Sequence, residues 1–87
     1  MTTFDLGNKL REMYDSPDEN KVNMILLFGI LYASDIKKVV AGSNINSVVN
    51  EIINHSKLPK SYATEIKKAI LLSNYVSPTL EALKKFL

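Results

Sequence analysis

Residues 51–70, EIINHSKLPKSYATEIKKAI, decide how the second half of this chain folds. On each side of a short polar interruption, apolar residues recur three and four positions apart, which is typical of two amphipathic helices joined by a turn. Ile52 and Ile53 form the apolar side of the first helix, and Leu58 follows the turn, where it would fill the corner. The pattern predicts a helix-turn-helix.

The second helix of this motif carries an outward side whose chemistry suits a nucleic acid. Ala63, Ile66 and Ile70 are predicted to face inward. Hydroxyl groups hydrogen-bond to phosphates or base edges, and lysines supply phosphate contacts. The predicted nucleic-acid-binding residues are Lys57, Lys60, Ser61, Tyr62, Thr64, Lys67 and Lys68. Because the N-terminal part of a recognition helix meets the major groove, we expect the partner to be double-stranded DNA.

Positive charge is concentrated in the half of the chain that contains this motif. The chain has 87 residues and a formal net charge of +2, which is too small to indicate a nucleic-acid ligand on its own. Residues 1–43 carry a net −1, whereas residues 44–87 carry a net +3. With His55, the lysines of residues 57–68 would neutralise several phosphates, so binding should weaken steeply with salt. A solvated helix face would produce the same lysine run, and this interpretation stays open.

Two residues depart from the usual helix-turn-helix pattern. Ile53 stands where a small residue, often alanine, is expected at the helix crossing. Lys57 stands in the turn where glycine is usual, and a left-handed conformation costs a non-glycine residue about 1 kcal/mol. The second helix also lacks arginine, whose contact with guanine is the commonest specific one. The pattern therefore favours the structural motif more strongly than sequence-specific recognition.

Working outward, the rest of the chain is predicted to be helical, so that residues 1–87 form one all-α domain. We expect a compact bundle of five to six short helices with a helix-turn-helix-like core. The expected helices cover about Phe4–Tyr14, Pro17 through Phe28, a segment around Ile36–Val40 after a bend near Gly29–Ser34, Asn44 or Asn46 to about His55, Pro59 or Ser61 to about Tyr75, and an additional C-terminal helix within residues 76–87.

Local signals predict several of these helix ends. Ser16 and Glu19 have the spacing of a capping box, and Pro17 fits the first helical position because its missing N–H has no partner there. Ser77-Pro78 repeats the pattern before the last helix. Gly42 is expected to end the third helix, since glycine adopts the left-handed cap conformation without steric cost.

Composition argues against several classes of function. The chain contains no cysteine and one histidine, which excludes disulfides, thiolate metal sites and a multi-histidine zinc site. It has no glycine-rich phosphate loop and no paired carboxylates with a basic partner. We therefore expect no enzymatic activity and no cofactor.

The N-terminus and the apolar runs bear on localisation. Residues 1–6 lack the basic start and apolar stretch of a secretory signal. The longest apolar run, Met24–Tyr32, has nine residues, whereas a membrane-spanning helix needs about 20. The sequence therefore predicts a soluble, cytoplasmic protein with no membrane partner.

The same run supports an alternative function. Eight of the nine residues in Met24–Tyr32 are apolar, and one buried helix can absorb much of that. The remainder, with Tyr14, Tyr75, Phe86 and Leu87, would form an exposed patch of the kind that marks association sites. The alternative is a protein–protein interaction or dimerisation module without catalysis. A homodimer would also suit DNA binding, because dimers read paired half-sites. The other interpretation of these apolar residues is structural: all of them are buried in the core.

Two stretches resemble a known family. They are KLREMYDSPDENKVNMILLFGILYASDI, residues 9–36, and SYATEIKKAILLSNYV, residues 61–76. In these residues and their order the chain resembles the small bacterial HTH-like domain proteins. The resemblance implies an all-helical fold with a helix-turn-helix-like core, and a bacterial origin. It brings no catalytic or ligand-binding residues to this sequence, and residues 77–87 lie outside it.

Overall fold

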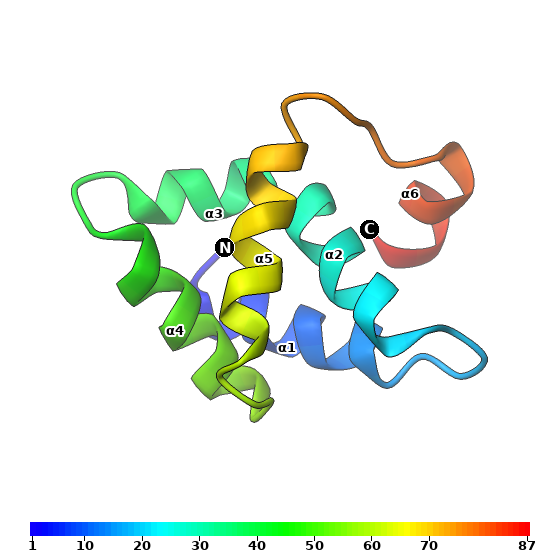
Figure 1. The fold of residues 1–87 in the computed structure, drawn as a ribbon, viewed down its shortest axis with the longest axis horizontal. Coiled ribbons are helices and arrows are strands. Elements are labelled where there is room, and N and C mark those ends of the chain that lie inside the picture. Colours follow the sequence, from blue (N-terminus) through cyan, green and yellow to red (C-terminus); the bar gives the residue numbers. More distant parts are fainter.

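A computed structural model describes all 87 residues as six helices without a strand. The all-α bundle expected from the sequence is confirmed, and Figure 1 shows its arrangement. The helices are α1 (Thr3–Tyr14), α2 (Lys21–Leu31), α3 (Ala33–Val40), α4 (Ile45–Ser56), α5 (Tyr62–Leu72) and α6 (Leu80–Phe86).

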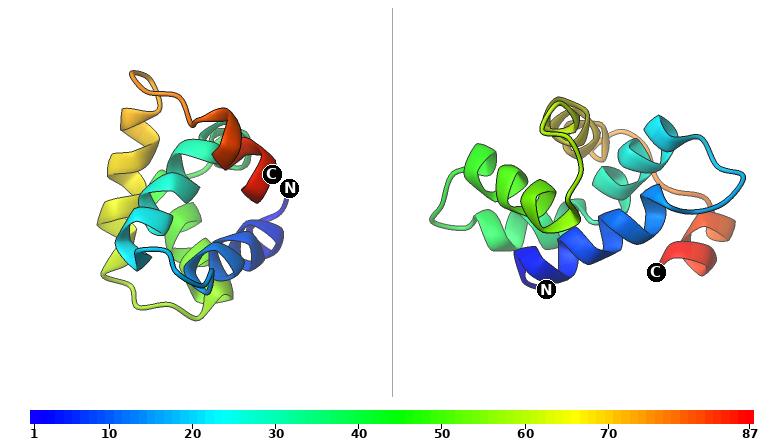
Figure 2. Two further views of the ribbon diagram at one scale, coloured as in Figure 1. Left: turned by 90° about the vertical axis from the view of Figure 1, so that its right-hand side faces the viewer. Right: turned by 90° about the horizontal axis from the view of Figure 1, so that it is seen from below.

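The bundle is built around two pairs of crossing helices, α1 with α4 and α2 with α5, which make the most extensive contacts in the molecule. Figure 2 shows the same two crossings from the side and from below. Each crossing is close at a glycine. A Cβ atom on Gly7 of α1 would lie 2.9 Å from the carbonyl oxygen of Ile52 in α4. A Cβ atom on Gly29 of α2 would overlap the Cβ of Ala69 in α5.

One apolar core lies between these pairs, and all helices from α1 to α5 contribute to it. Its completely buried side chains are Leu6, Leu10, Ile25, Phe28, Ile36, Val49, Ile52, Ile53, Ile66 and Ala69. Every residue of the run Met24–Tyr32 is buried or half-buried. This run is therefore part of the core, and it does not supply an exposed patch for the alternative function.

Most of the predicted helix ends lie at the expected residues. Asn44 caps α4, and its side-chain oxygen accepts hydrogen bonds from the backbone N–H groups of Asn46 and Ser47. The break between α2 and α3 falls at Tyr32, inside the predicted bend. Gly42 follows the end of α3 with a φ of +80°, the left-handed conformation expected of it.

Both predictions of a helix start at a Ser-Pro pair are wrong. Asp18 adopts a left-handed φ of 63°, which interrupts a helix begun at Pro17, and α2 begins instead after Asn20. The Asn20 side chain caps α2 by accepting from the backbone N–H of Asn23 at 3.0 Å. In the same way Thr79, not Ser77, caps α6. In both segments another residue that can cap a helix stands two to four positions later, and that residue makes the capping hydrogen bond.

The end of α5 is also earlier than expected. The helix ends at Leu72 rather than near Tyr75, because its last backbone bonds tighten to three-residue spacing. The N–H of Asn74 donates to the carbonyl of Leu71, and the N–H of Tyr75 donates to that of Leu72. Residues 73–75 therefore continue the helix direction as tight turns.

Helix α6 lies beside α1 and α2, at the end of an extended connection (Figure 1). The Tyr32 hydroxyl donates to the carbonyl oxygen of Phe86 at 2.9 Å, and Lys85 Nζ lies 3.0 Å from Glu19 Oε1. Phe86 packs against the edge of the core. None of the six helices has the length and apolar character that crossing a membrane requires.

Candidate nucleic-acid interface

Helices α4 and α5 with residues 57–61 between them have the arrangement that the sequence pattern predicts. The left-handed residue of the turn is Lys57, with a φ of 60°, at the position where glycine is usual. Leu58 is 8% exposed and fills the corner between the helices, as expected. Ile66 and Ile70 are buried, and Ala63 is half-buried against the core.

Ser56, which was not among the residues predicted from the sequence, secures the turn. Its side chain is buried, and its hydroxyl donates to the carbonyl oxygen of Ile53 at 2.7 Å. The Ser56 Oγ also accepts a hydrogen bond from the backbone N–H of Leu58 at 3.3 Å. A serine two residues before the corner leucine was the available signal, since serine hydroxyls bond to the backbone two residues ahead in tight turns.

Glycine at position 57 is expected to stabilise the protein. Lys57→Gly removes the steric cost of a left-handed side chain, which is about 1 kcal/mol for a non-glycine residue. Lys57→Ala is the matched control, because it also removes the charge but keeps the Cβ. Urea unfolding should therefore show the glycine variant to be more stable than the alanine variant by about 1 kcal/mol. Equal stability of the two variants would show that the turn carries no such strain.

Five of the seven predicted contact residues are exposed. They are Lys57, Lys60, Ser61, Thr64 and Lys68. Ser61 stands at the N-cap of α5 without making a side-chain capping bond, so its hydroxyl is open to a ligand. Thr64 and Lys68 follow it at helical spacing, on the side of α5 opposite Ile66 and Ile70. Exposed lysines and hydroxyls therefore occur along the turn and along α5 as far as Lys68.

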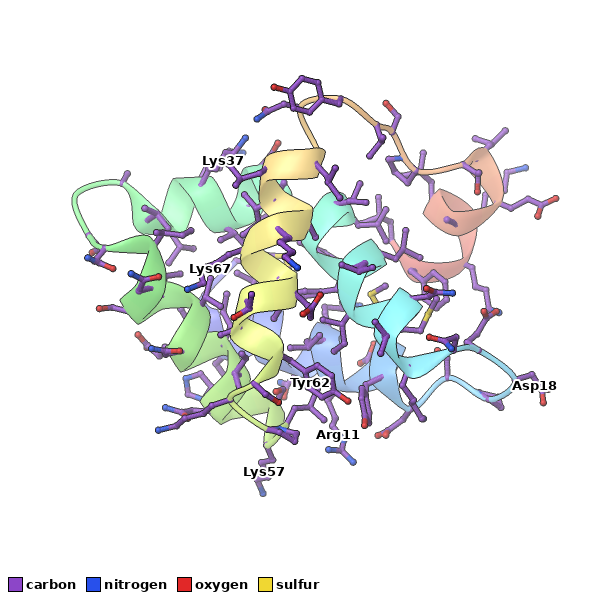
Figure 3. The ribbon with its side chains drawn as sticks, viewed as in Figure 1. Arg11, Asp18, Lys37, Lys57, Tyr62 and Lys67 are labelled. Carbon is purple, nitrogen blue, oxygen red and sulfur yellow. The ribbon has the colours of Figure 1, made fainter.

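The other two predicted residues make contacts within the fold. The expectation that Tyr62 faces outward is wrong, because its half-buried ring packs edge-on against Tyr14 with 5.8 Å between centroids. The two hydroxyl oxygens lie 3.4 Å apart, and this hydrogen bond with Tyr14 raises the pKa of Tyr62. Lys67 Nζ donates to Asn46 Oδ1 at 2.9 Å and so links α5 to the first turn of α4. Figure 3 shows Tyr62 and Lys67 on the sides of α5.

His55, near the end of α4, packs against α1. Its ring meets Phe4 edge-on, with 5.5 Å between centroids, and its Nε2 lies 4.0 Å from Glu51 Oε1. Its side chain is still partly exposed, so the expected contribution of His55 to phosphate contacts stays a prediction. It belongs to the packing of α4 on α1.

Two surface hollows of about 260 Å³ each lie elsewhere, along the two edges of α6. Both are lined by Lys85 and Phe86, together with residues of α1 in one case and of α2 in the other. They are gaps beside a small packed helix, and neither reaches the turn between α4 and α5.

Comparison with protein families identifies the architecture. The family model described as "HTH-like domain" matches residues 2–79. The match extends from the N-cap of α1 through α5 and ends just before α6. No curated protein and no solved structure matches the chain. Because the matched residues contain both crossing helix pairs and the whole of the helix-turn-helix, the chain belongs to the HTH-like domain family.

Proposed function

We propose that this protein binds double-stranded DNA, without catalysis, through the exposed side of residues 57–68, which comprise the turn between α4 and α5 and the part of α5 up to Lys68. The observation that carries the proposal is the grouping of three exposed lysines with two hydroxyl groups. The lysines are Lys57, Lys60 and Lys68, and the hydroxyls belong to Ser61 and Thr64. Membership of the HTH-like domain family agrees with nucleic-acid binding.

The geometry suggests a division of roles. The first turn of α5 would enter the major groove, where Ser61 and Thr64 would meet phosphates or base edges. Lys57 and Lys60 precede this turn and Lys68 follows it, so they would reach phosphates on both sides of the groove. Since the turn and α5 contain no arginine for guanine, their phosphate contacts would supply most of the affinity and sequence selectivity would be modest.

Salt dependence tests this directly. We expect a fluorescently labelled mixed duplex to bind the protein in an anisotropy titration, with an affinity that falls about 40-fold between 50 and 200 mM salt if three phosphates are neutralised. Circular dichroism in both buffers would verify that the fold is unchanged. Absence of binding by the folded protein at 50 mM salt would contradict the proposed function.

Charge reversal on the surface tests its location. Lys60→Glu with Lys68→Glu should weaken binding at least tenfold, because two phosphate contacts are replaced by repulsion. Both side chains are exposed, so the fold should be unaffected. Lys9→Glu with Lys84→Glu is the charge-matched control. Lys9 lies in α1 and Lys84 in α6, so both are outside the proposed surface. An equal loss in both double variants would mean that net charge alone governs binding.

A further inference from the structure

One arginine points to the same side of the molecule as the turn between α4 and α5, and it comes from α1. Arg11 is the only arginine of the chain and stands in the last turn of α1. Its side chain is 46% exposed. Figure 3 shows Arg11 and Lys57 both extending from the lower edge of the molecule in that view. The turn is therefore not the only source of positive charge on this side.

Two aromatic rings connect Arg11 to the start of α5. The guanidinium carbon Cζ lies 5.8 Å from the centroid of the Tyr14 ring. That ring meets the ring of Tyr62, the first residue of α5, edge-on with 5.8 Å between centroids. The guanidinium therefore lies within about 12 Å of the Tyr62 ring, and this distance is about the width of the major groove.

Lys21 of α2 also holds Tyr14 in place. Its Nζ donates to the backbone carbonyl oxygen of Tyr14 and lies 4.8 Å from the centroid of the Tyr14 ring. Tyr14 is thus fixed by its own helix α1, by α2 through Lys21 and by α5 through Tyr62. The ring beside which Arg11 lies is a part of the packed structure.

The guanidinium of Arg11 is oriented, but most of its donors are free. Its Nε donates to Asp15 Oδ2 at 2.9 Å, whereas its two terminal amino groups make no hydrogen bond within the protein. The Tyr14 ring and the Asp15 carboxylate together restrict how the guanidinium plane turns. The outer edge therefore presents a preformed fork of N–H groups, the arrangement that binds two oxygens of one phosphate group.

We propose that Arg11 binds a backbone phosphate at the edge of the major groove that the first turn of α5 enters. This contact rests on the proposed DNA binding, and it adds a residue from outside the helix-turn-helix. A phosphate suits Arg11 better than a base edge, because two tyrosine rings separate the guanidinium from α5. When Ser61 and Thr64 reach into the groove, a group about one groove width away meets the strand that borders it.

A fourth phosphate contact changes the salt dependence by a measurable amount. Each neutralised phosphate lowers the affinity about 3.5-fold between 50 and 200 mM salt. Lys57, Lys60 and Lys68 alone therefore account for a fall of about 40-fold, and Arg11 raises it to about 150-fold. In the anisotropy titration of a mixed duplex, Arg11→Gln should return the fall to about 40-fold and weaken binding at 50 mM salt about tenfold.

Two further variants make the test specific. Lys9→Gln is the matched control, because Lys9 lies in the same helix, is 41% exposed and is paired with Glu12 at 3.7 Å. Since Lys9 lines the hollow beside α6, its replacement should leave the affinity and the salt dependence unchanged. Arg11→Lys keeps the charge and loses the fork, so it should keep the steep salt dependence and bind about threefold more weakly.

All three variants are expected to keep the fold. Glutamine and lysine form helices about as well as arginine does, and exposed ion pairs contribute little to stability. Circular dichroism of each variant would verify this before the titration.

The outcomes separate this contact from the proposed function. Both are wrong if the wild type does not bind the duplex. Only the contact is wrong if the wild type binds and Arg11→Gln matches its affinity and salt dependence, or if Lys9→Gln causes an equal loss. Wild-type affinity of Arg11→Lys would also contradict the contact, because it would show that a charge suffices and that the positioned fork does not act.

Discussion

Replacing Gly29 with alanine is expected to lower the free energy of unfolding by about 2 kcal/mol, although alanine is the better helix former by about 1 kcal/mol. A Cβ atom at this position would overlap the Cβ of Ala69 and lie 3.1 Å from the carbonyl oxygen of Ile66. Neither atom can move by a change of rotamer, because one is backbone and the other is attached to it directly. The crossing of α2 and α5 would have to open, which disturbs a close-packed core.

A compensating variant makes this prediction specific. Ala69→Gly combined with Gly29→Ala moves the methyl group from α5 to α2, and most of the lost stability should return. In thermal unfolding the single change at Gly29 should lower Tm by about 10 °C, given 4–8 °C per kcal/mol for a domain of this size. A Gly29→Ala protein as stable as the wild type would mean that α2 and α5 do not pack at this distance.

This crossing also determines which side of α5 meets solvent. Ile66 and Ala69 are pressed against α2, so Thr64 and Lys68 must point away from it. The candidate DNA surface is therefore a consequence of packing at Gly29, which lies far from the lysines in the sequence. A variant that opens the crossing should weaken DNA binding even though it changes no charge.

Periodicity allowed the second half of the fold to be predicted. Apolar residues at helical spacing identify α4 and α5 and their buried sides, because burial of one side is what the spacing reflects. The starts of α2 and α6 could not be predicted in the same way. Ser16 competes with Asn20, and Ser77 with Thr79, and each of these four residues is an acceptable cap in isolation. The packed structure, not the local sequence, selects between them.

The candidate site was predictable to a similar extent. Exposed lysines and hydroxyls follow from the same helical spacing, and five of the seven residues are exposed. Tyr62 and Lys67 differ because their partners are remote, with Tyr14 lying 48 residues and Asn46 lying 21 residues earlier in the chain. Periodicity within one helix carries no information about which other helix supplies a hydrogen-bond partner.

The position of the small residues distinguishes this domain from the usual helix-turn-helix pattern. That pattern places a small residue where the two helices of the motif cross, and this chain has Ile53 there. The close crossings are made instead by Gly7 of α1, which packs against α4, and by Gly29 of α2, which packs against α5. Helices α4 and α5 contact each other less than each contacts its crossing partner. Ile53 is completely buried in the core that these helices share.

Ile53→Ala therefore discriminates between the general pattern and this structure. The pattern predicts that alanine is tolerated or preferred at the crossing. The structure predicts a loss of about 3 kcal/mol in the free energy of unfolding, from the lost burial and the cavity left behind, with Ile53→Val costing about 1 kcal/mol. Urea unfolding of both variants measures the difference. If the alanine variant had the same free energy of unfolding as the wild type, α4 and α5 would be able to close onto a small residue. Ile53 would then not fix the separation between these helices that leaves the turn and its lysines exposed.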